Sequence, residues 1–290
     1  MIRKVGRAAG REEILGLLQP LVARWFGDAF SGLTEPQAFA LPLIHEGKSV
    51  LVSSPTGSGK TLTAFLTVLN ELYALQKAGK LEDRIYCVYV SPLKALANDI
   101  NRNLEQPLRE MTELAPKLGE PAPEIRVGVR SGDTSASERQ RQARRPPHIF
   151  ITTPESLAIV LSAPKFREKF GGVQWVILDE IHEVCASKRG ELLSVTLERL
   201  QEHVGEDITR IGLSATIAPI DEVAKFLVGY KGGKLRDVNV VEVESRKSLD
   251  LAVICPVRDL TEVDMESANA RMYALLSDLI DQHRTTLIFT

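Results

Sequence analysis

The residues with the clearest chemical potential form a glycine-rich turn, Ser54-Pro55-Thr56-Gly57-Ser58-Gly59-Lys60-Thr61, before a helical pattern that begins at Leu62. Glycines allow backbone N–H groups to surround a phosphate, and the start of a helix adds a positive end. Lys60 can then reach the β- and γ-phosphates of a nucleotide, and the Thr61 hydroxyl can bind Mg²⁺. The turn ends in Gly-Lys-Thr like a P-loop, although Ser54 stands where that pattern has its first glycine.

An acidic pair follows the most apolar run of the chain, because Trp175-Val176-Ile177-Leu178 leads directly into Asp179 and Glu180. A P-loop needs an acidic partner for its metal on another strand, so Asp179 is placed to hold Mg²⁺ through water and Glu180 to deprotonate the attacking water. By itself, an Asp-Glu pair after a strand is equally typical of an ordinary helix N-terminus. His182 has no second His nearby, so we expect a relay between the nucleotide and Ser214-Ala215-Thr216 rather than a metal site.

A glutamine upstream of the turn is a candidate for recognition of the base. Gln37 follows Leu33-Thr34-Glu35-Pro36, and its amide can pair with N6 and N7 of adenine, which would select ATP. A Gln after Pro is otherwise typical of the first turn of a helix. Trp25, Phe26 and Phe30 are candidates for stacking on the base, although such aromatic side chains more often belong to a core.

Short apolar runs, which alternate with helical patterns, position these residues. The runs are Ser49–Ser53, Ile85–Val90, Ile149–Thr152, Trp175–Asp179 and Arg210–Ser214. Nearly continuous β-branched runs are typical of strands buried on both faces of a parallel sheet, with helices as the crossovers. The expected fold class is therefore α/β, with a doubly wound parallel sheet. Ligands of such sheets bind beyond the carboxyl ends of the strands, so the polar clusters that end these runs should share one rim.

Composition limits the remaining possibilities. The chain has 290 residues, 44% of them hydrophobic, which allows two domains at about 150 residues each. Its net charge of −2 gives no bulk reason to expect nucleic acid, so such a partner must be argued from local sites. The three cysteines are widely spaced among apolar neighbours, which indicates reduced core residues. No stretch has the length of a signal peptide or a membrane span, so we expect no membrane partner and a cytoplasmic location.

A domain boundary is expected at Gly229–Lys234, where glycines interrupt the helical pattern. Residues 1–232 are assigned to the nucleotide-binding domain, and residues 233–290 to a linker and the truncated beginning of a second domain. In that second part, a helix over Met265–His283 leads into Thr285–Thr290, which is expected to be a strand.

Four arginines gather in Ser137–Arg145, on a predicted helix that follows Gly132-Asp133. Such a charge run is compatible with a solvated helix face and with contact to a nucleic-acid backbone, and the two interpretations have equal weight.

Together the motifs resemble the first RecA-like domain of a superfamily-2 DExH-box helicase, and within that group the large helicase-related (Lhr) proteins. The resemblance covers residues 20 to 290. It rests on Leu33–Gln37, Pro55–Thr61, Ser91–Leu96, Arg130–Thr134, Thr152–Leu157, Asp179–His182 and Ser214–Thr216, in that order. The narrower match to the Lhr group rests on Ser187-Lys188-Arg189-Gly190 and Leu197-Glu198-Arg199-Leu200.

The resemblance implies a helicase or translocase that uses ATP and Mg²⁺ to move 3′ to 5′ along single-stranded DNA and to unwind duplexes, including RNA–DNA hybrids. It makes residues 1–232 the ATP-binding RecA-like domain and residues 233–290 the start of a second one. Ser214 and Thr216 match the motif that links hydrolysis to strand separation. Positions that match the family's contacts to the nucleic-acid backbone are Pro92, Leu93, Lys94, Gly132, Asp133, Thr153, Pro154 and Glu155.

One pattern of such families is absent from the sequence. Their second RecA-like domain carries Gln-x-x-Gly-Arg-x-Gly-Arg, whose arginines reach the γ-phosphate, and these 290 residues do not contain it. Two other functions therefore stand beside a helicase. A P-loop small-molecule kinase is disfavoured because the sequence shows no recognisable acceptor pocket or lid, whereas a nucleotide-gated nucleic-acid-binding module without significant turnover stays open.

Overall fold

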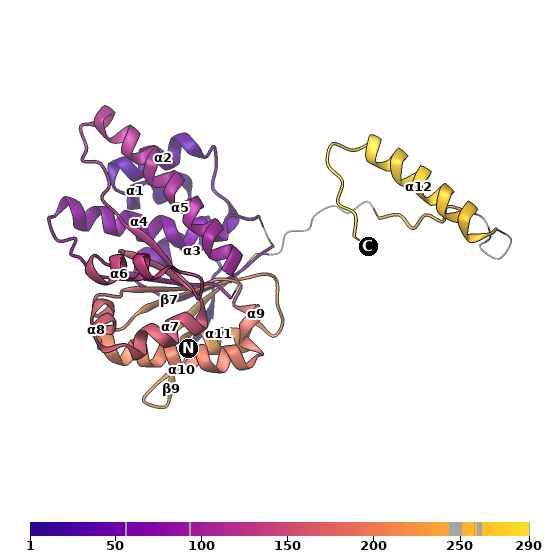
Figure 1. Ribbon diagram of the computed structural model, residues 1–290. Helices are drawn as coiled ribbons and strands as arrows, with labels where there is room; N and C mark the ends of the chain where they lie inside the picture. The colour runs from indigo at the N-terminus through magenta and orange to yellow at the C-terminus, as the bar shows by residue number, and fades with distance from the viewer. Residues whose placement is uncertain (56, 93, 244–250, 258, 260–262, 290) are drawn as a thin grey trace. The chain divides into compact units, whose positions relative to one another are not determined.

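The computed structural model describes residues 1–55, 57–92, 94–243, 251–257, 259 and 263–289, without the side chains of 94–103. The chain divides into two compact units, Met1–Ser245 and Arg246–Thr290. Figure 1 shows the helices and strands of both units.

The first unit is built on an eight-stranded sheet in which every neighbouring pair of strands is parallel. The strand order is β1-β10-β2-β7-β6-β3-β5-β4. Parallel neighbours require crossover connections, so this order confirms the predicted doubly wound α/β fold. The strands are β1 (Ile2–Lys4), β2 (Val50–Ser53), β3 (Cys87–Val90), β4 (Val127–Arg130), β5 (Ile149–Thr152), β6 (Trp175–Leu178), β7 (Thr209–Ser214) and β10 (Val238–Glu242).

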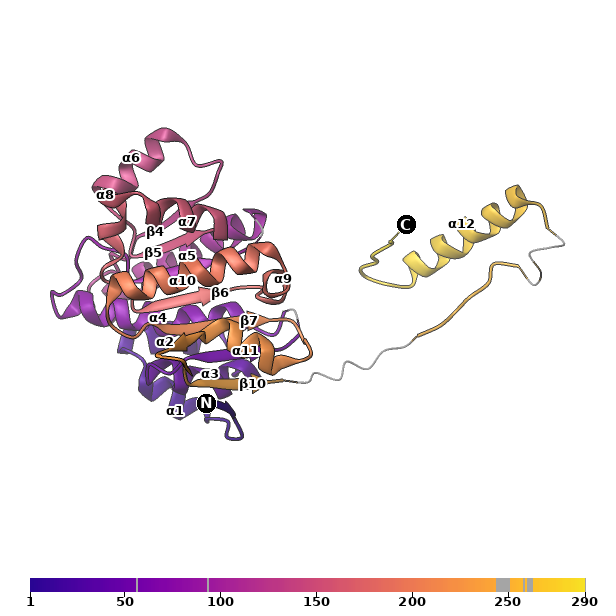
Figure 2. The same cartoon turned by 90° about the horizontal axis from the view of Figure 1, so that it is seen from below.

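Helices cover both faces of this sheet (Figures 1 and 2). On one face lie α1 (Arg11–Leu17), α2 (Pro20–Ala29), α3 (Glu35–His45), α4 (Lys60–Lys77) and α5 (Lys94–Leu114). On the other lie α7 (Pro154–Ser162), α10 (Lys188–Val204) and α11 (Ile220–Val228). Shorter elements are η1 (Ala115–Leu118), α6 (Ala136–Arg144), α8 (Pro164–Arg167), η2 (Glu168–Phe170) and α9 (His182–Cys185).

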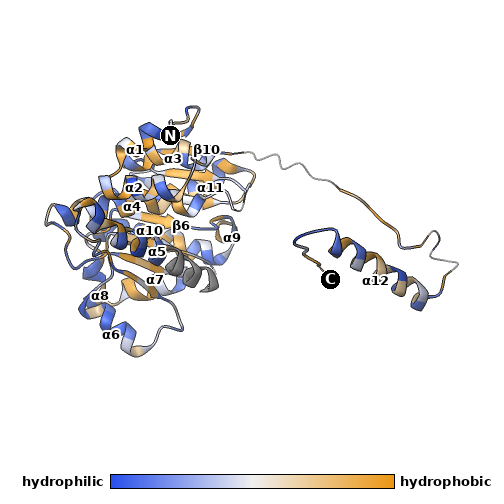
Figure 3. Ribbon diagram, turned by 90° about the horizontal axis from the view of Figure 1, so that it is seen from above, coloured by the Kyte–Doolittle hydropathy of each residue, from blue (hydrophilic) through white to orange (hydrophobic). Residues whose placement is uncertain are grey.

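The alternation of side chains along the strands builds two cores, one on each face. Val50 and Val52 of β2 pack with the first group of helices, and Leu51 between them packs with the second group. Figure 3 shows the apolar residues concentrated on the strands and on the helix faces that cover them. The central strands are therefore buried on both sides, which explains why they are continuous apolar runs in the sequence.

Strand β10 places the end of the first unit later than the sequence predicts. Val238–Glu242 lies between β1 and β2, with Val240 opposite both Lys4 and Leu51. The predicted boundary at residue 232 would separate this strand from the sheet that it completes, and the first compact unit instead continues to Ser245. An apolar alternation marks a strand but does not identify the sheet that the strand joins.

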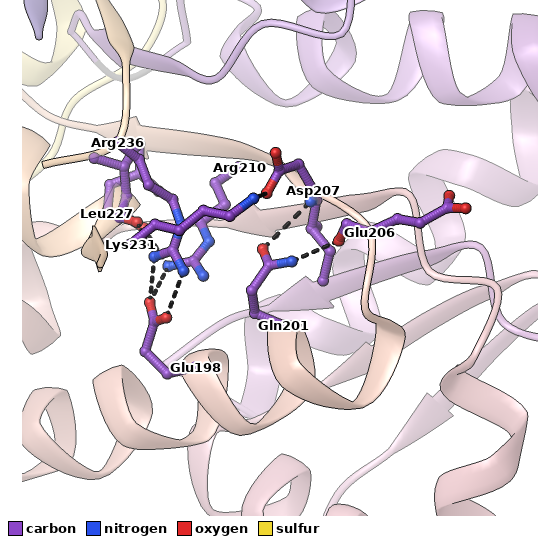
Figure 4. Close-up of polar contacts among 10 residues, drawn as sticks. Glu198, Gln201, Glu206, Asp207, Arg210, Leu227, Lys231 and Arg236 are labelled. Atoms are coloured by element: carbon purple, nitrogen blue, oxygen red, sulfur yellow. Dashed lines mark hydrogen bonds and ion pairs between the residues drawn. The ribbon is translucent and has the colours of Figure 1, made fainter. Parts of the chain in front are cut away.

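A cluster of charged side chains lies where α10 passes the amino-terminal end of β7 (Figure 4). Glu198 of α10 accepts a hydrogen bond of 2.9 Å from Arg210 of β7 and one of 2.7 Å from Arg236. Arg210 is only 2% exposed, and burial lowers its pKa while Glu198 opposes that effect. Nearby, β8 (Tyr230–Lys231) and β9 (Lys234–Leu235) form a hairpin whose turn uses two glycines at positive φ. Glu198 thus provides the counter-charge for a buried guanidinium.

The second unit contains the helix α12 (Met265–Asp281), which begins where the Asp264 carboxylate accepts a hydrogen bond of 2.9 Å from the Ser267 N–H. Its apolar residues recur at helical spacing, at Met272, Leu275, Leu276 and Leu279. The strand expected at Thr285–Thr290 is not present in residues 285–289, since a strand needs neighbours for its N–H and C=O groups. Among the described residues, none of the helices combines the length and hydropathy that crossing a membrane requires.

We predict that Glu198→Ala lowers the free energy of unfolding by about 1.5–3 kcal/mol, because it leaves the buried Arg210 guanidinium without its counter-charge and with the Leu227 carbonyl as a remaining acceptor. Urea denaturation followed by circular dichroism measures this. Glu222→Ala, which removes a carboxylate from the exposed Lys225 ion pair, is the control. Equal losses in the two variants would contradict the role assigned to Glu198.

Candidate nucleotide site and adjoining rim loops

The rim, meaning the edge of the sheet formed by the carboxyl ends of its strands, collects the predicted site residues. The P-loop follows β2, Asp179 follows β6 and Ser214 closes β7, and these strands are neighbours in the order β2-β7-β6. The segments with Pro92, Gly132 and Thr153 follow β3, β4 and β5, which form the adjoining part of the sheet in the order β3-β5-β4. We call these three segments the rim loops. Strand order therefore separates the two sets of predicted residues on a shared rim.

The P-loop closes on itself through glycines and a pair of hydroxyls. Gly57 and Gly59 have φ values of 77° and 84°, a region that favours glycine, and Gly59 caps α4. The hydroxyl oxygens of Ser54 and Ser58 lie 2.7 Å apart, so Ser54 supports the loop by a side-chain contact where the P-loop pattern has a glycine. Thr56 lies outside the described residues.

Lys60 points back across the loop that precedes it. Its Nζ donates hydrogen bonds to the carbonyl oxygens of Ser54, at 2.6 Å, and Pro55, at 3.0 Å. Burial lowers the pKa of Lys60, and the negative charges of Glu180 and Asp179 oppose that effect. A cavity of about 330 Å³ joins these groups, and it is lined by Gly57, Gly59, Lys60, Thr61, Asp179 and Glu180. The structure thus brings the P-loop and the acidic pair together, as the sequence predicts.

Asp179 is held by two donors. Its Oδ1 accepts a hydrogen bond of 2.9 Å from the Glu180 N–H, and its Oδ2 accepts one from the Tyr89 hydroxyl. Tyr89 is buried on β3, and its ring stacks on Phe65 of α4 with centroids 5.1 Å apart. Burial raises the pKa of Asp179, and the hydrogen bond from Tyr89 is the main opposing effect. The role of Tyr89 cannot be predicted from the sequence, because a tyrosine within an apolar strand gives no signal of such a contact.

Glu180 and His182 connect the acidic pair to the end of β7. Glu180 has a φ of 45°, a conformation that a non-glycine residue rarely adopts. Burial and the neighbouring charge of Asp179 raise the pKa of Glu180. His182 Nδ1 lies 3.4 Å from Glu180 Oε2, 3.4 Å from Ser214 Oγ and 3.4 Å from the Ala215 nitrogen. His182 therefore stands between the acidic pair and the Ser-Ala-Thr segment, whereas Thr216 is exposed.

Gln37 lies beneath the P-loop. It is 2% exposed, and its Oε1 accepts a hydrogen bond of 2.9 Å from the Thr34 N–H at the start of α3. A Cβ atom added at Gly59 would lie 3.5 Å from Gln37 Nε2, so the amide nitrogen is next to the loop. The amide oxygen therefore caps a helix, and only the amide nitrogen approaches the nucleotide site.

The three aromatic candidates for base stacking differ in accessibility. Phe26 is completely buried, and Trp25 is 5% exposed and donates a hydrogen bond of 2.8 Å to Glu110. Phe30 is 36% exposed. It lines a cavity of about 750 Å³ whose wall also includes Thr61 and other residues at the start of α4. Trp25 also lines this cavity, but of the three candidates Phe30 is the most exposed.

The rim loops are held by helix caps and local hydrogen bonds. Thr153 caps α7, with its Oγ1 accepting a hydrogen bond of 3.3 Å from the Ser156 N–H, and Pro154 is the buried first residue of that helix. The Gly132 carbonyl, beside Asp133, accepts a hydrogen bond of 3.0 Å from Arg139. One arginine of the predicted charge run therefore stabilises a rim loop. Leu93 and the side chain of Lys94 are outside the described residues.

The protein ligands available for Mg²⁺ are few. Thr61 and Asp179 line the same cavity. Within the part of the chain that the structure describes, no group of three or more His, Cys, Asp or Glu side chains is arranged to hold a metal ion. Mg²⁺ in nucleotide sites usually takes one or two protein ligands and completes its shell with water and phosphate oxygens. The donors fit a metal that binds together with a nucleotide.

Comparison with known proteins places the chain in a family. Residues 34–225 match the model of the DEAD/DEAH box helicases, and the chain belongs to this family. The match agrees with the resemblance seen in the sequence motifs.

Particular relatives carry the name Lhr. The chain is 54% identical over its whole length to ATP-dependent helicase Lhr-Core of Methanothermobacter thermautotrophicus, of which it covers 33%. It is 37% identical to Lhr helicase/uracil glycosylase of Escherichia coli, over 94% of this chain and 19% of that protein. The structure of Mycobacterium smegmatis helicase Lhr bound to ssDNA and AMP-PNP matches with a TM-score of 0.80 and 42% identity, over 94% of this chain and 34% of that one. The chain thus spans between 19% and 34% of the length of these relatives.

We predict that Tyr89→Phe weakens the binding of Mg²⁺ by about 10- to 100-fold, since Asp179 loses the hydrogen bond that orients it. A Mg²⁺ titration of the binding of a fluorescent ATP analogue measures this, and binding without Mg²⁺ should stay unchanged. Tyr73→Phe, which removes a buried hydroxyl bonded to the Pro121 carbonyl, is the matched control. Equal Mg²⁺ midpoints for Tyr89→Phe and the original chain would contradict this role.

Proposed function

We propose that the chain is the ATP-binding and nucleic-acid-binding RecA-like part of an ATP-dependent helicase or translocase. The observation that carries this proposal is the division of one rim between the nucleotide residues after β2, β6 and β7 and the rim loops after β3, β4 and β5. The similarity to a helicase Lhr structure that contains ssDNA and AMP-PNP supports both halves of the proposal.

The residues that line the smaller of the two cavities, the one of about 330 Å³ between the P-loop and the acidic pair, have distinct tasks in ATP hydrolysis. Lys60 and the loop amides of Gly57 to Gly59 bind the β- and γ-phosphates. Thr61 and Asp179 would hold Mg²⁺, which neutralises phosphate charge when it is bound. Glu180 orients the attacking water and accepts its proton. Its raised pKa makes it a stronger base than an exposed glutamate.

The adenine base has a place beside the start of α4. We assign stacking to Phe30, because its ring has exposed surface in the cavity that Thr61 also lines. The Gln37 amide nitrogen can contribute one hydrogen bond to the base, while its oxygen remains engaged with Thr34. This assignment replaces the bidentate pairing that the sequence predicts, since one of the two amide atoms already has a partner.

The nucleic acid in this proposal is a single strand held by its phosphates. The rim loops offer backbone amides, and the amino-terminal end of α7 points to the same rim. Such contacts bind without reading sequence and weaken with salt. The 3′ to 5′ direction, the preference for DNA and the unwinding of duplexes and hybrids rest on the resemblance to Lhr proteins. We also propose that Arg246–Thr290 begins a second RecA-like domain, supported by the apolar stripe on α12.

We predict that Lys60→Ala weakens ATP binding by about 10- to 100-fold, because the phosphates lose a charged donor. Isothermal titration calorimetry measures the affinity, and a thermal melt shows whether the P-loop keeps its fold without the two hydrogen bonds of Lys60. Lys77→Ala, at the far end of α4, is the control. ATP binding by Lys60→Ala as tight as that of the original chain would remove the basis for the nucleotide site.

The alternative, a nucleotide-gated module without turnover, is favoured by the absence of the Gln-x-x-Gly-Arg-x-Gly-Arg pattern from the sequence. An arginine at the γ-phosphate contributes a factor of about 10³–10⁵ to the rate of hydrolysis, so we predict that this chain alone hydrolyses ATP very slowly and unwinds no duplex.

Phosphate release measured with and without single-stranded DNA separates the two functions. Stimulation by DNA that Glu180→Gln abolishes supports the helicase part. Binding of both ligands without any release supports the alternative. ATP-driven unwinding by a monomer would contradict the alternative and also the prediction that this chain alone unwinds no duplex.

A further inference from the structure

The Ser187-Lys188-Arg189-Gly190 segment has no task in the nucleotide chemistry, although it follows the acidic pair closely. It consists of Ser187, which is the N-cap of α10, and the first three residues of that helix, shortly after α9. The Ser187 Oγ donates a hydrogen bond of 2.8 Å to the Val184 carbonyl oxygen, and the Ser187 N–H lies 3.0 Å from the same oxygen. A Cβ atom on Gly190 would lie 2.2 Å from that oxygen, so only glycine allows the two backbones to approach. Ser187 and Gly190 thus fix where α10 begins.

Arg189 extends from this fixed turn to two of the rim loops. Its Nε donates a hydrogen bond of 2.6 Å to Glu155 Oε1, and its Nη2 lies 3.3 Å from Glu155 Oε2. The same Nη2 donates a bond of 2.8 Å to the Pro92 carbonyl oxygen. Pro92 follows β3 and Glu155 follows β5, and these strands are neighbours. One guanidinium therefore connects both loops to the turn that follows the acidic pair.

This contact changes the task of Glu155. The resemblance predicts that Glu155 contacts the nucleic-acid backbone, but a carboxylate repels phosphates, and this one is paired in a bidentate ion pair. The hydrogen bonds from Arg189 lower the pKa of Glu155, so it stays ionised at neutral pH. An ionised Glu155 repels the phosphates of a bound strand. It favours binding of the strand only if it holds in place a loop that this binding requires.

We propose that Arg189 and Glu155 are positioning residues that set the spacing of the rim loops after β3 and β5 for a single-stranded phosphodiester backbone. Neither side chain touches the strand. The pair acts by holding the Pro92 loop and the start of α7 at a fixed distance from the first turn of α10. This inference rests on the proposed function of the rim as a nucleic-acid surface.

The test uses the 290-residue chain and a fluorescein-labelled oligothymidylate, with fluorescence anisotropy recorded over a series of salt concentrations. We expect Arg189→Ala and Glu155→Gln each to weaken binding about fivefold, the effect of losing a partly exposed ion pair at the upper end of its range. The double variant should bind no more weakly than either single variant, because both substitutions remove the same contact. The slope of affinity against salt should not change. Lys225→Ala and Glu222→Gln, from an ion pair on α11, should bind like the original chain.

The outcome for Glu155→Gln is the sharpest, since this substitution removes a negative charge from a surface that binds phosphates. Tighter or unchanged binding would overturn the proposal. So would a salt slope reduced by about 0.7 in Arg189→Ala, because that is the signature of one lost phosphate contact to a single strand. A double variant weakened by the product of the two single effects would also overturn it.

Two further measurements separate other causes. If circular dichroism shows that Arg189→Ala does not fold, Arg189→Lys takes its place, and the same loss is expected because lysine keeps the charge but cannot bind two oxygens in a bidentate geometry. No binding by the original chain at low salt would overturn the proposed function and this inference together. Normal binding by the original chain with unaffected variants would overturn this inference alone.

Discussion

The parallel pairing of β3 with β6 is the constraint on which the rest of the site depends. Val90 lies opposite Leu178, and the Asp179 N–H donates a hydrogen bond of 2.9 Å to the Val90 carbonyl. The acidic pair and the first rim loop therefore leave the sheet at the same level. A shift of the register between β3 and β6 by one residue would turn Tyr89 to the opposite face of the sheet, away from both Asp179 and Phe65. The pairing register thus fixes the Asp179 carboxylate, for which we propose Mg²⁺ binding, and joins the nucleotide half of the rim to the other half.

The electrostatics of the smaller cavity follow from placing two adjacent carboxylates in a confined space. Burial raises the pKa of both Asp179 and Glu180, and Lys60 and His182 offset this only in part. A cation would lower the free energy of both ionised carboxylates, and the P-loop amides favour the anion that accompanies that cation. The backbone at Glu180 costs about 1–3 kcal/mol of strain. The Asp179 carboxylate on the Glu180 N–H helps to hold that conformation.

Much of the fold could be predicted because the central strands are buried on both faces and their sequences are continuous apolar runs. Strand β4 could not be predicted in this way, since it is a short edge strand with Gly128 in its middle, where a Cβ atom would lie 2.9 Å from Pro147. The P-loop and the acidic pair could be predicted because each is a local pattern with its own chemistry. The contacts of Tyr89 and Arg189 could not be predicted. Tyr89 lies 90 positions from Asp179, Arg189 lies 34 positions from Glu155 and 97 from Pro92, and these contacts depend on strand order and register.

The two segments that support the narrower resemblance to Lhr proteins lie on one helix, and the structure gives a physical reason for their association. Near its start, α10 presents Arg189 to the rim loops, and further along it presents Glu198 to Arg210 and Arg236. These two positions are nine residues apart, which corresponds to about 13 Å along the helix. A movement of the rim loops that displaced α10 along its axis would therefore also separate Glu198 from the buried Arg210 guanidinium, which is costly. The ion pairs at the two positions restrain one rigid element, so Arg189 can hold the rim loops in place because Glu198 holds the helix.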